Sequence, residues 1–236
     1  MNKIGSIWAV ALSCLVIVYT GCEPSSYTFS QIEDLEAFSR ELPEQLQQTV
    51  TQGGFTFTLA YQPEDLLMLN EHKYLEELYA ANASESRIKS QVSFISEQQK
   101  SFAQSLHFKL IITPDEDDDL IYKKLHQDGF GNYSAWLKKL LFGLQEHVHI
   151  STQNAQDIPL LNYQMTRSFG TNKSRSFLLH FPMTWNDEMI ANGEPMTIEI
   201  DEFGLGIGKV SMTFDTPFPA VEFKNNQEHI DESTSL

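Results

Sequence analysis

Hydrophobic and polar residues alternate along several short segments in the C-terminal half of the chain. This period of two is typical of β-strands with one buried face. The clearest case is Met196, Ile198 and Ile200, which alternate with polar residues. The predicted strands cover 147–151, 160–168, 176–181, 196–201 and 209–215. A polar face on each strand favours antiparallel sheets that are solvated on one side.

The N-terminal half is dominated by the three- and four-residue spacing of amphipathic helices. The expected helices cover 32–46, 64–78, 87–102, 120–125 and 136–144. Ser30-Gln31-Ile32-Glu33 has the form of a capping box, and Pro43 is expected to bend the first helix. The segment 87–102 also fits a strand around Val92 and Phe94, and we favour the helix. Two strands are predicted between the helices, at 55–61 and 106–112.

These elements together predict an α+β fold class, in which amphipathic helices pack on a largely antiparallel sheet. Residues 30–224 contain no internal repeat and no long low-complexity stretch. Their number is ordinary for a single domain. Residues 225–236 are polar and lack periodicity, which predicts a flexible tail.

The first 22 residues differ from the rest of the chain. The stretch from Ile4 to Val18 is almost continuously apolar and follows Lys3. Its length suits the hydrophobic region of a signal peptide, since a transmembrane helix needs about 20 apolar residues. The stretch ends in Val18-Tyr19-Thr20-Gly21-Cys22, which resembles the lipobox of bacterial lipoproteins. Gly21 and Cys22 match its last two positions, while Val18 stands where leucine is usual.

The resemblance implies cleavage before Cys22 and attachment of fatty acyl chains such as palmitate to that residue. Residues 1–21 would then be a signal peptide and residues 22–29 a tether. The alternative is an uncleaved anchor helix in which the cysteine is incidental. In enterobacterial lipoproteins an aspartate directly after the lipidated cysteine favours retention in the inner membrane. This chain has Glu23 there, which favours the outer membrane. In general character the mature chain resembles the uncharacterised lipoproteins of Bacteroidota, and no motif matches a named domain family.

The net charge and the cysteine content limit which partners and which chemistry we expect for this chain. The chain has 32 acidic against 16 basic residues, a formal net charge of -16 at pH 7. We therefore expect no nucleic-acid partner and no electrostatic adsorption to anionic lipid. Membrane association would depend on the lipid at Cys22, with an envelope protein as a further partner. Cys14 lies in the leader, so the mature chain would lack disulfides and a cysteine nucleophile.

An acidic run and a pair of histidines contain metal-ligand residue types. Asp115, Asp117 and Asp119 belong to a run of five acidic residues. This run lacks the glycine and glutamate of an EF-hand loop, so we favour a solvated turn over a calcium site. His147 and His149 would share one strand face, but no third ligand is adjacent in sequence. We favour hydrogen-bonded strand histidines and expect neither a metal nor a cofactor.

Three other histidines are distant candidates as metal partners for His147 and His149, namely His107, His126 and His180. A separate glycine-rich segment, 204–209, has some likeness to a phosphate-binding loop. Its context is wrong for that loop, because it lies between two predicted strands and Val210 stands where Ser or Thr would bind magnesium. We expect a glycine-rich hairpin there.

No catalytic motif is evident. The chain has no Gly-x-Ser-x-Gly and no His-Glu-x-x-His. The acid pairs 187–188 and 201–202 would form a paired-carboxylate centre only if their loops met. Trp185, in a polar loop, is the aromatic residue that we single out for ligand contact. We therefore expect a non-catalytic, lipid-anchored envelope protein with a binding or scaffold role. The alternative is a secreted-type hydrolase or carbohydrate-active protein.

Replacement of Cys22 by serine is expected to abolish fatty-acid attachment, because serine lacks the acceptor thiol. The measurement is metabolic labelling of intact cells with radioactive palmitate, followed by purification of the protein. Cys14→Ser is the matched control and should keep the label. Equal labelling of the two variants would contradict the lipobox interpretation.

Overall fold

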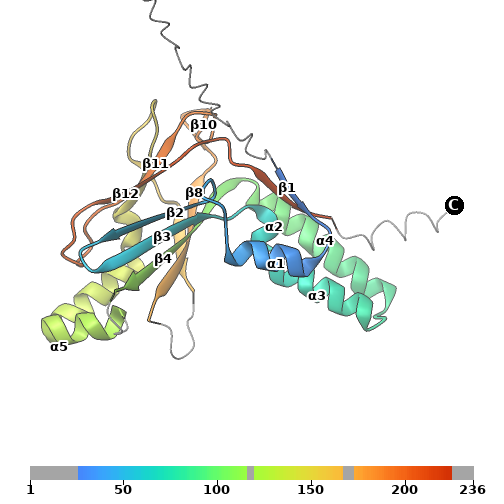
Figure 1. Cartoon of the computed structure of the whole chain (residues 1–236), viewed down its shortest axis with the longest axis horizontal. Coiled ribbons are helices and arrows are strands. Elements are labelled where there is room, and N and C mark those ends of the chain that lie inside the picture. The colour runs from blue at the N-terminus through green and yellow to red at the C-terminus, as the bar shows by residue number, and fades with distance from the viewer. Residues whose placement is uncertain (1–25, 116–119, 167–172, 225–236) are drawn as a thin grey trace, which may run out of the picture.

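The computed structural model describes residues 26–115, 120–166 and 173–224, with the backbone alone over 121–128. The larger of its two main sheets has five strands (Figure 1). In spatial order they are β2 (Gln47–Gln52), β3 (Phe55–Tyr61), β4 (Ser105–Pro114), β8 (Arg175–Pro182) and β7 (Asn162–Met165). Every neighbouring pair is antiparallel.

The second main sheet has four antiparallel strands. In spatial order they are β12 (Val210–Phe214), β11 (Met196–Ile200), β5 (Val148–Ser151) and β6 (Ile158–Pro159). Two smaller pairs complete the strands. One joins β1 (Ser26–Phe29) to β13 (Ala220–Phe223) in parallel, and the other joins β9 (Thr184–Trp185) to β10 (Glu188–Met189).

The helices lie in two groups (Figure 1). One group packs beside β13 and the N-terminal end of β4, and consists of α1 (Ile32–Arg40), α2 (Glu64–Leu67), α3 (Leu69–Ala80) and α4 (Glu85–Phe102). On the opposite side of the sheets from this group lies α5 (Leu120–Phe142) (Figure 1), which is followed by the short 3-10 helix η1 (Leu144–Glu146). The backbone of Gly129 leaves the helical region, with φ 73°, and kinks α5.

The apolar faces of the two main sheets contribute to a single core. Phe57, Phe108 and Phe177 of the larger sheet are fully buried in it. The rings of Phe108 and Phe214 lie 5.5 Å apart, which joins β4 of one sheet to β12 of the other. Trp136 of α5 belongs to the same cluster. Burial of large aromatic rings therefore holds the sheets together.

The predicted α+β class is confirmed, as is the antiparallel pairing of the two best strands. Ile198 lies opposite Met212 in the β11–β12 pair, and both side chains are buried. The helix over 87–102 is also confirmed, as α4. The strand predicted to start at residue 147 starts one residue later, at Val148. The strand predicted over 160–168 is β7 up to Met165, and its end lies outside the described residues.

The helix predicted over 32–46 is shorter in the structure. It ends at Arg40, and Pro43 lies in the turn before β2 rather than at a bend in the helix. The strand at 47–52 was missed because its sequence is mostly polar, as suits a half-exposed edge strand. The capping box was wrong as well, since Gln31 is the N-cap and makes no side-chain cap bond.

The tether expected over 22–29 includes a strand. Ser26–Phe29 form β1, whose residue Ser26 lies opposite Ala220. The rings of Tyr27 and Phe29 pack on Phe38 of α1, with centroids 4.8 and 5.0 Å away. Hydrogen bonds and aromatic contacts therefore fix this segment to the domain. The flexible tail expected at 225–236 lies outside the described residues.

The glycine-rich segment connects β11 and β12, as expected for a hairpin. Its backbone N–H groups bind the chain's own carboxylate. Glu202 accepts hydrogen bonds from the backbone N–H groups of Gly204, Gly206, Ile207 and Gly208. Partial burial raises the pKa of Glu202, but the four N–H donors outweigh it and lower the pKa to about 2. Glycine is required at 204, where a Cβ would lie 2.6 Å from Cδ1 of Trp136.

Glu202→Gln should therefore flatten the acid limb of the stability curve. Because the folded pKa lies below the ordinary 4.5, the ionised form contributes stability above about pH 4.5 that is lost as pH falls towards 2. The variant should be less stable than the wild type by about 1 kcal/mol at neutral pH, after allowance for solvent screening. Urea unfolding measured from neutral pH to pH 2 should show this difference shrinking. Glu188→Gln is the control, and a similar loss in both variants would argue against the role of the loop.

Candidate functional site

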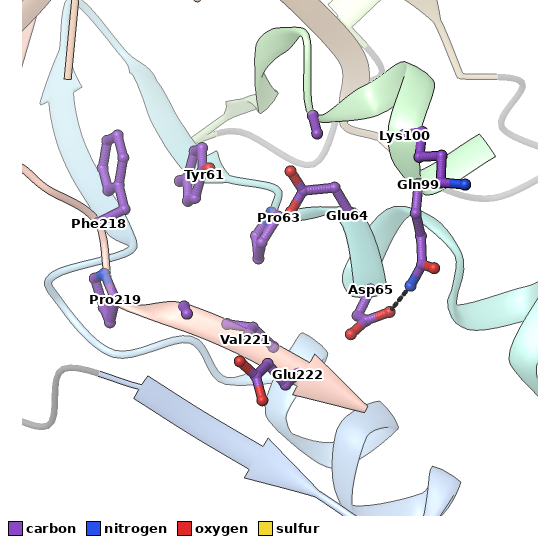
Figure 2. Close-up of a pocket in the computed structure, with 12 residues that line it drawn as sticks. Tyr61, Pro63, Glu64, Asp65, Gln99, Lys100, Phe218, Pro219, Val221 and Glu222 are labelled. Carbon is purple, nitrogen blue, oxygen red and sulfur yellow. Dashed lines mark hydrogen bonds between the residues drawn. The ribbon is translucent and has the colours of Figure 1, made fainter. Parts of the chain in front are cut away.

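A cleft of about 530 Å³ lies where the end of β3, helices α2 and α4, and strand β13 meet (Figure 2). Segments far apart in the sequence therefore build it. Its lining residues are Tyr61, Pro63, Glu64, Asp65, Gln99, Lys100, Ala103, Phe218, Pro219, Ala220, Val221 and Glu222. The volume is within the range of sites for small ligands.

One wall of the cleft is aromatic. The rings of Tyr61 and Phe218 are stacked, with centroids 4.0 Å apart and planes at 10°. Both also pack against Phe108 of the core, at 5.5 and 5.8 Å. Burial, with a smaller contribution from the charge of Glu64, raises the pKa of Tyr61 to about 12. Its hydroxyl therefore stays protonated at physiological pH and can donate a hydrogen bond.

Asp65 is the most buried polar residue among those that line the cleft. Its side chain is buried, and both carboxylate oxygens have partners. Oδ1 lies 2.9 Å from Nε2 of His72 and also accepts from the Gln99 amide, while Oδ2 accepts from the backbone N–H of Phe223 at 2.7 Å. Asp65 thus joins α2, α3, α4 and β13. Figure 2 shows its hydrogen bond to Gln99. These contacts position the walls and leave the carboxylate little capacity for chemistry.

Charged groups that reach solvent surround the mouth of the cleft. Lys100 and Glu222 are exposed, and Glu64 is half-buried. The carboxylate of Glu222 also contacts the ammonium of Lys224 at 3.2 Å, an exposed ion pair of small energy. The cleft therefore combines an aromatic wall with hydrogen-bonding groups of both charges.

Trp185 does not line this cleft. It lies in the β9–β10 hairpin, half-buried against the main core. The two turn residues, Asn186 and Asp187, both have positive φ, at 51° and 65°. These angles are those of a two-residue type I′ turn. The tryptophan therefore has a packing role in addition to any ligand contact.

The acid pairs at 187–188 and 201–202 are held by separate contacts. Glu202 is bound by its own loop, and Asp201 faces His149 and Lys209. Asp187 and Glu188 belong to the β9–β10 hairpin. None of the four acids lines the cleft. The carboxylates that do line it, Glu64, Asp65 and Glu222, were not singled out from the sequence.

The predicted metal candidates are only partly brought together. Asp115 accepts a hydrogen bond from Thr56 at 3.2 Å, while Asp117 and Asp119 lie outside the described residues. His147 directly precedes β5, and its carbonyl oxygen accepts a hydrogen bond from the Asp201 N–H at 2.7 Å. His149 lies on β5 with Nε2 3.0 Å from Oε2 of Glu199 on β11. This carboxylate is not evident from the sequence, because it lies 50 residues from His149 along the chain.

Two of the distant histidines pair with each other instead. Nδ1 of His107 lies 2.9 Å from Nδ1 of His180, on neighbouring strands β4 and β8. Nε2 of His107 donates to the carbonyl oxygen of Phe102, so its Nδ1 accepts the proton of His180. Burial lowers the pKa of both imidazoles. The side chain of His126 lies outside the described placements.

Comparison with known proteins identifies no family and no function for this chain. No protein-family model matches the chain, and no curated protein matches it. One similar solved structure is a protein of unknown function from Burkholderia pseudomallei K96243. It shares 14% identity over 78% of this chain and 90% of that chain, with a TM-score of 0.37. Among the described residues, no helix has the length and apolar character needed to span a bilayer.

Asp65→Ala is expected to destabilise the fold by about 3 kcal/mol, because it leaves His72, Gln99 and the Phe223 N–H without their acceptor. Urea unfolding gives the loss, and hydrogen exchange should show faster exchange of the Phe223 amide. Glu64→Ala removes the neighbouring carboxylate at the mouth of the cleft. This control should cost less than about 1 kcal/mol. Equal losses would show that Asp65 does not hold the helices to β13.

Proposed function

We propose that the chain is a lipid-anchored cell-envelope protein that binds a small polar ligand in the cleft, without catalysing a reaction on it. The commitment of Asp65 to three hydrogen bonds carries this proposal. A carboxylate that is buried and fully partnered holds a binding surface in shape, whereas a catalytic carboxylate must be able to exchange a proton with substrate. The groups at the mouth of the cleft are suited to recognition.

The chemistry of the cleft suits a ligand that carries hydroxyl groups on an otherwise apolar ring, as a saccharide does. Tyr61 and Phe218 each cover one face of the other ring, but both side chains are only half-buried and line the cleft, so their remaining apolar surface can take the C–H face of such a ring. Glu64 and Glu222 accept hydrogen bonds from hydroxyls, while Lys100 and Gln99 donate them. A saccharide would therefore use both parts of the lining.

The anchor would place this cleft close to the bilayer. Cys22 lies four residues before Ser26, and a fully extended chain of that length spans about 14 Å. Ser26 lies opposite Ala220, which lines the cleft. With Glu23 after the anchor, we favour the outer membrane. A ligand or a partner protein at that surface would meet the cleft directly.

The alternative is a carbohydrate-active hydrolase. It is favoured by the positions of Glu64 and Glu222, which line the cleft from α2 and β13 (Figure 2). Two carboxyl groups on either side of a bound sugar are the usual catalytic pair of glycosidases. A product assay separates the two functions, because only a hydrolase would release a cleaved saccharide.

The test is binding of the detergent-solubilised full-length protein to an oligosaccharide array, followed by calorimetry with each saccharide that binds. Lys100→Ala and Glu222→Gln remove exposed groups of the cleft. Each should weaken binding about tenfold, since a hydrogen bond to a charged group is worth about 1.5–3 kcal/mol. Lys138→Ala and Glu188→Gln are matched exposed controls outside the cleft and should bind like the wild type.

Three results would change the proposal. Binding that is equal in all four variants would move the site elsewhere on the surface. Failure of every saccharide to bind would reject the ligand class. Release of a cleaved product by the wild type, but not by Glu222→Gln, would establish the hydrolase in place of the binding protein.

A further inference from the structure

A histidine and two carboxylates converge on the second main sheet, away from the residues of the cleft. His149 of β5 and Glu199 of β11 lie directly opposite each other in the antiparallel register. Nε2 of His149 lies 3.0 Å from Oε2 of Glu199 and 3.4 Å from Oδ1 of Asp157. The three ligand atoms all lie within 4.8 Å of one another.

We propose that His149, Asp157 and Glu199 form a binding site for a divalent transition metal ion of the zinc type. One imidazole nitrogen and two carboxylate oxygens are donors that Zn²⁺ accepts, with bonds of about 2.0–2.2 Å. Donors at that distance in a tetrahedral arrangement lie about 3.4 Å apart, close to the separations of the His149 nitrogen from both carboxylates. Three protein ligands leave a fourth position for water.

The opposite side of the imidazole is also occupied. Oδ2 of Asp201 lies 3.8 Å from Nδ1 of His149, so that the ring lies between carboxylates. Metal-binding histidines commonly have a carboxylate on the nitrogen that does not bind the ion, and it orients the ring. Ser151 donates a hydrogen bond to Oε2 of Glu199 at 3.2 Å and so fixes the second ligand oxygen.

The charge of the cluster suits a dication. Three carboxylates, those of Asp157, Glu199 and Asp201, surround the imidazole. The only cation that contacts them among the described residues is Lys209, whose ammonium lies 3.3 Å from Oε1 of Glu199 and 3.4 Å from Oδ1 of Asp201. With a neutral imidazole the sum is three negative charges and one positive, or -2. Lys209 occupies Oε1 of Glu199, while Oε2 is directed at His149.

A metal ion would reach this cluster from the side of Asp157. The side chains of His149 and Glu199 are 13% and 22% exposed, whereas that of Asp157 is 83% exposed. The loop before Asp157 is closed by a hydrogen bond from the Thr152 N–H to the Ala155 carbonyl, at 2.7 Å. Two ligands are thus fixed on strands, and the third lies at the entrance.

The test is calorimetric titration of the full-length protein with Zn²⁺ after chelator treatment, with Mg²⁺ and Ca²⁺ as comparison ions. We expect one saturable Zn²⁺ site per chain, because the imidazole favours zinc over the two hard cations. His149→Ala and Asp157→Asn should each weaken Zn²⁺ binding at least tenfold. Asp201→Asn, which changes a carboxylate that faces the ring and contacts Lys209 but is not itself a ligand, should weaken it by about tenfold. His147→Ala, two residues away from the ligand, should bind zinc like the wild type.

Equal affinity of His149→Ala and His147→Ala would overturn the site, as would the absence of saturable Zn²⁺ binding. Either result would mean that the cluster is a network of hydrogen bonds and ion pairs that holds no metal ion. A substitution at Glu199 would also remove its contact with Lys209 and could disturb the sheet. Asp157 is exposed, so Asp157→Asn should fold normally. Preserved zinc affinity in a folded Asp157→Asn would likewise reject the three-ligand site.

Discussion

The ring of Phe108 is the point on which both sheets and the cleft depend. It is fully buried on β4 and contacts the rings of Phe181 on β8, Phe214 on β12 and Phe218 at the cleft wall. Each of these partners comes from a different segment of the chain. Tight packing of such rings fixes the separation and orientation of the segments that carry them, because a close-packed interior leaves little room for a shift. The aromatic wall of the cleft is therefore an extension of the core.

Among the helices, the hydrogen bonds of one buried carboxylate fix the neighbouring segments. Asp65 connects three helices to the last strand through hydrogen bonds to His72, Gln99 and Phe223. A buried carboxylate is costly without partners, so each lost partner would weaken the whole joint. The cleft thus has one wall fixed by apolar packing and a floor fixed by a polar network. Preorganisation of this kind would lower the entropic cost of binding the ligand that we propose.

The acidic residues near the end of β11 have different roles. The ionised form of Glu202 is stabilised by backbone N–H groups of the kind that bind phosphate in other proteins. This internal occupation explains why a glycine-rich loop here need not be an external anion site. At the neighbouring end of β11, by contrast, Glu199 and Asp201 gather around one imidazole. The same acidic composition therefore serves loop structure in one place and a candidate cation site in another.

The sequence by itself determined the α+β class, most strand positions and the helix predicted at 87–102, because local periodicity records which face of an element is buried. It failed at β2, where an edge strand buries too little to show a pattern, and at β1, whose partner β13 is almost 200 residues away. The tertiary structure alone decided the sites. Pro63 to Asp65 marked the start of a helix in the sequence, but the cleft exists only because Phe218 and Gln99 fold against them. His149 was recognised as a ligand type, yet its partner Glu199 follows from strand register, which depends on how whole faces pack rather than on any nearby residue.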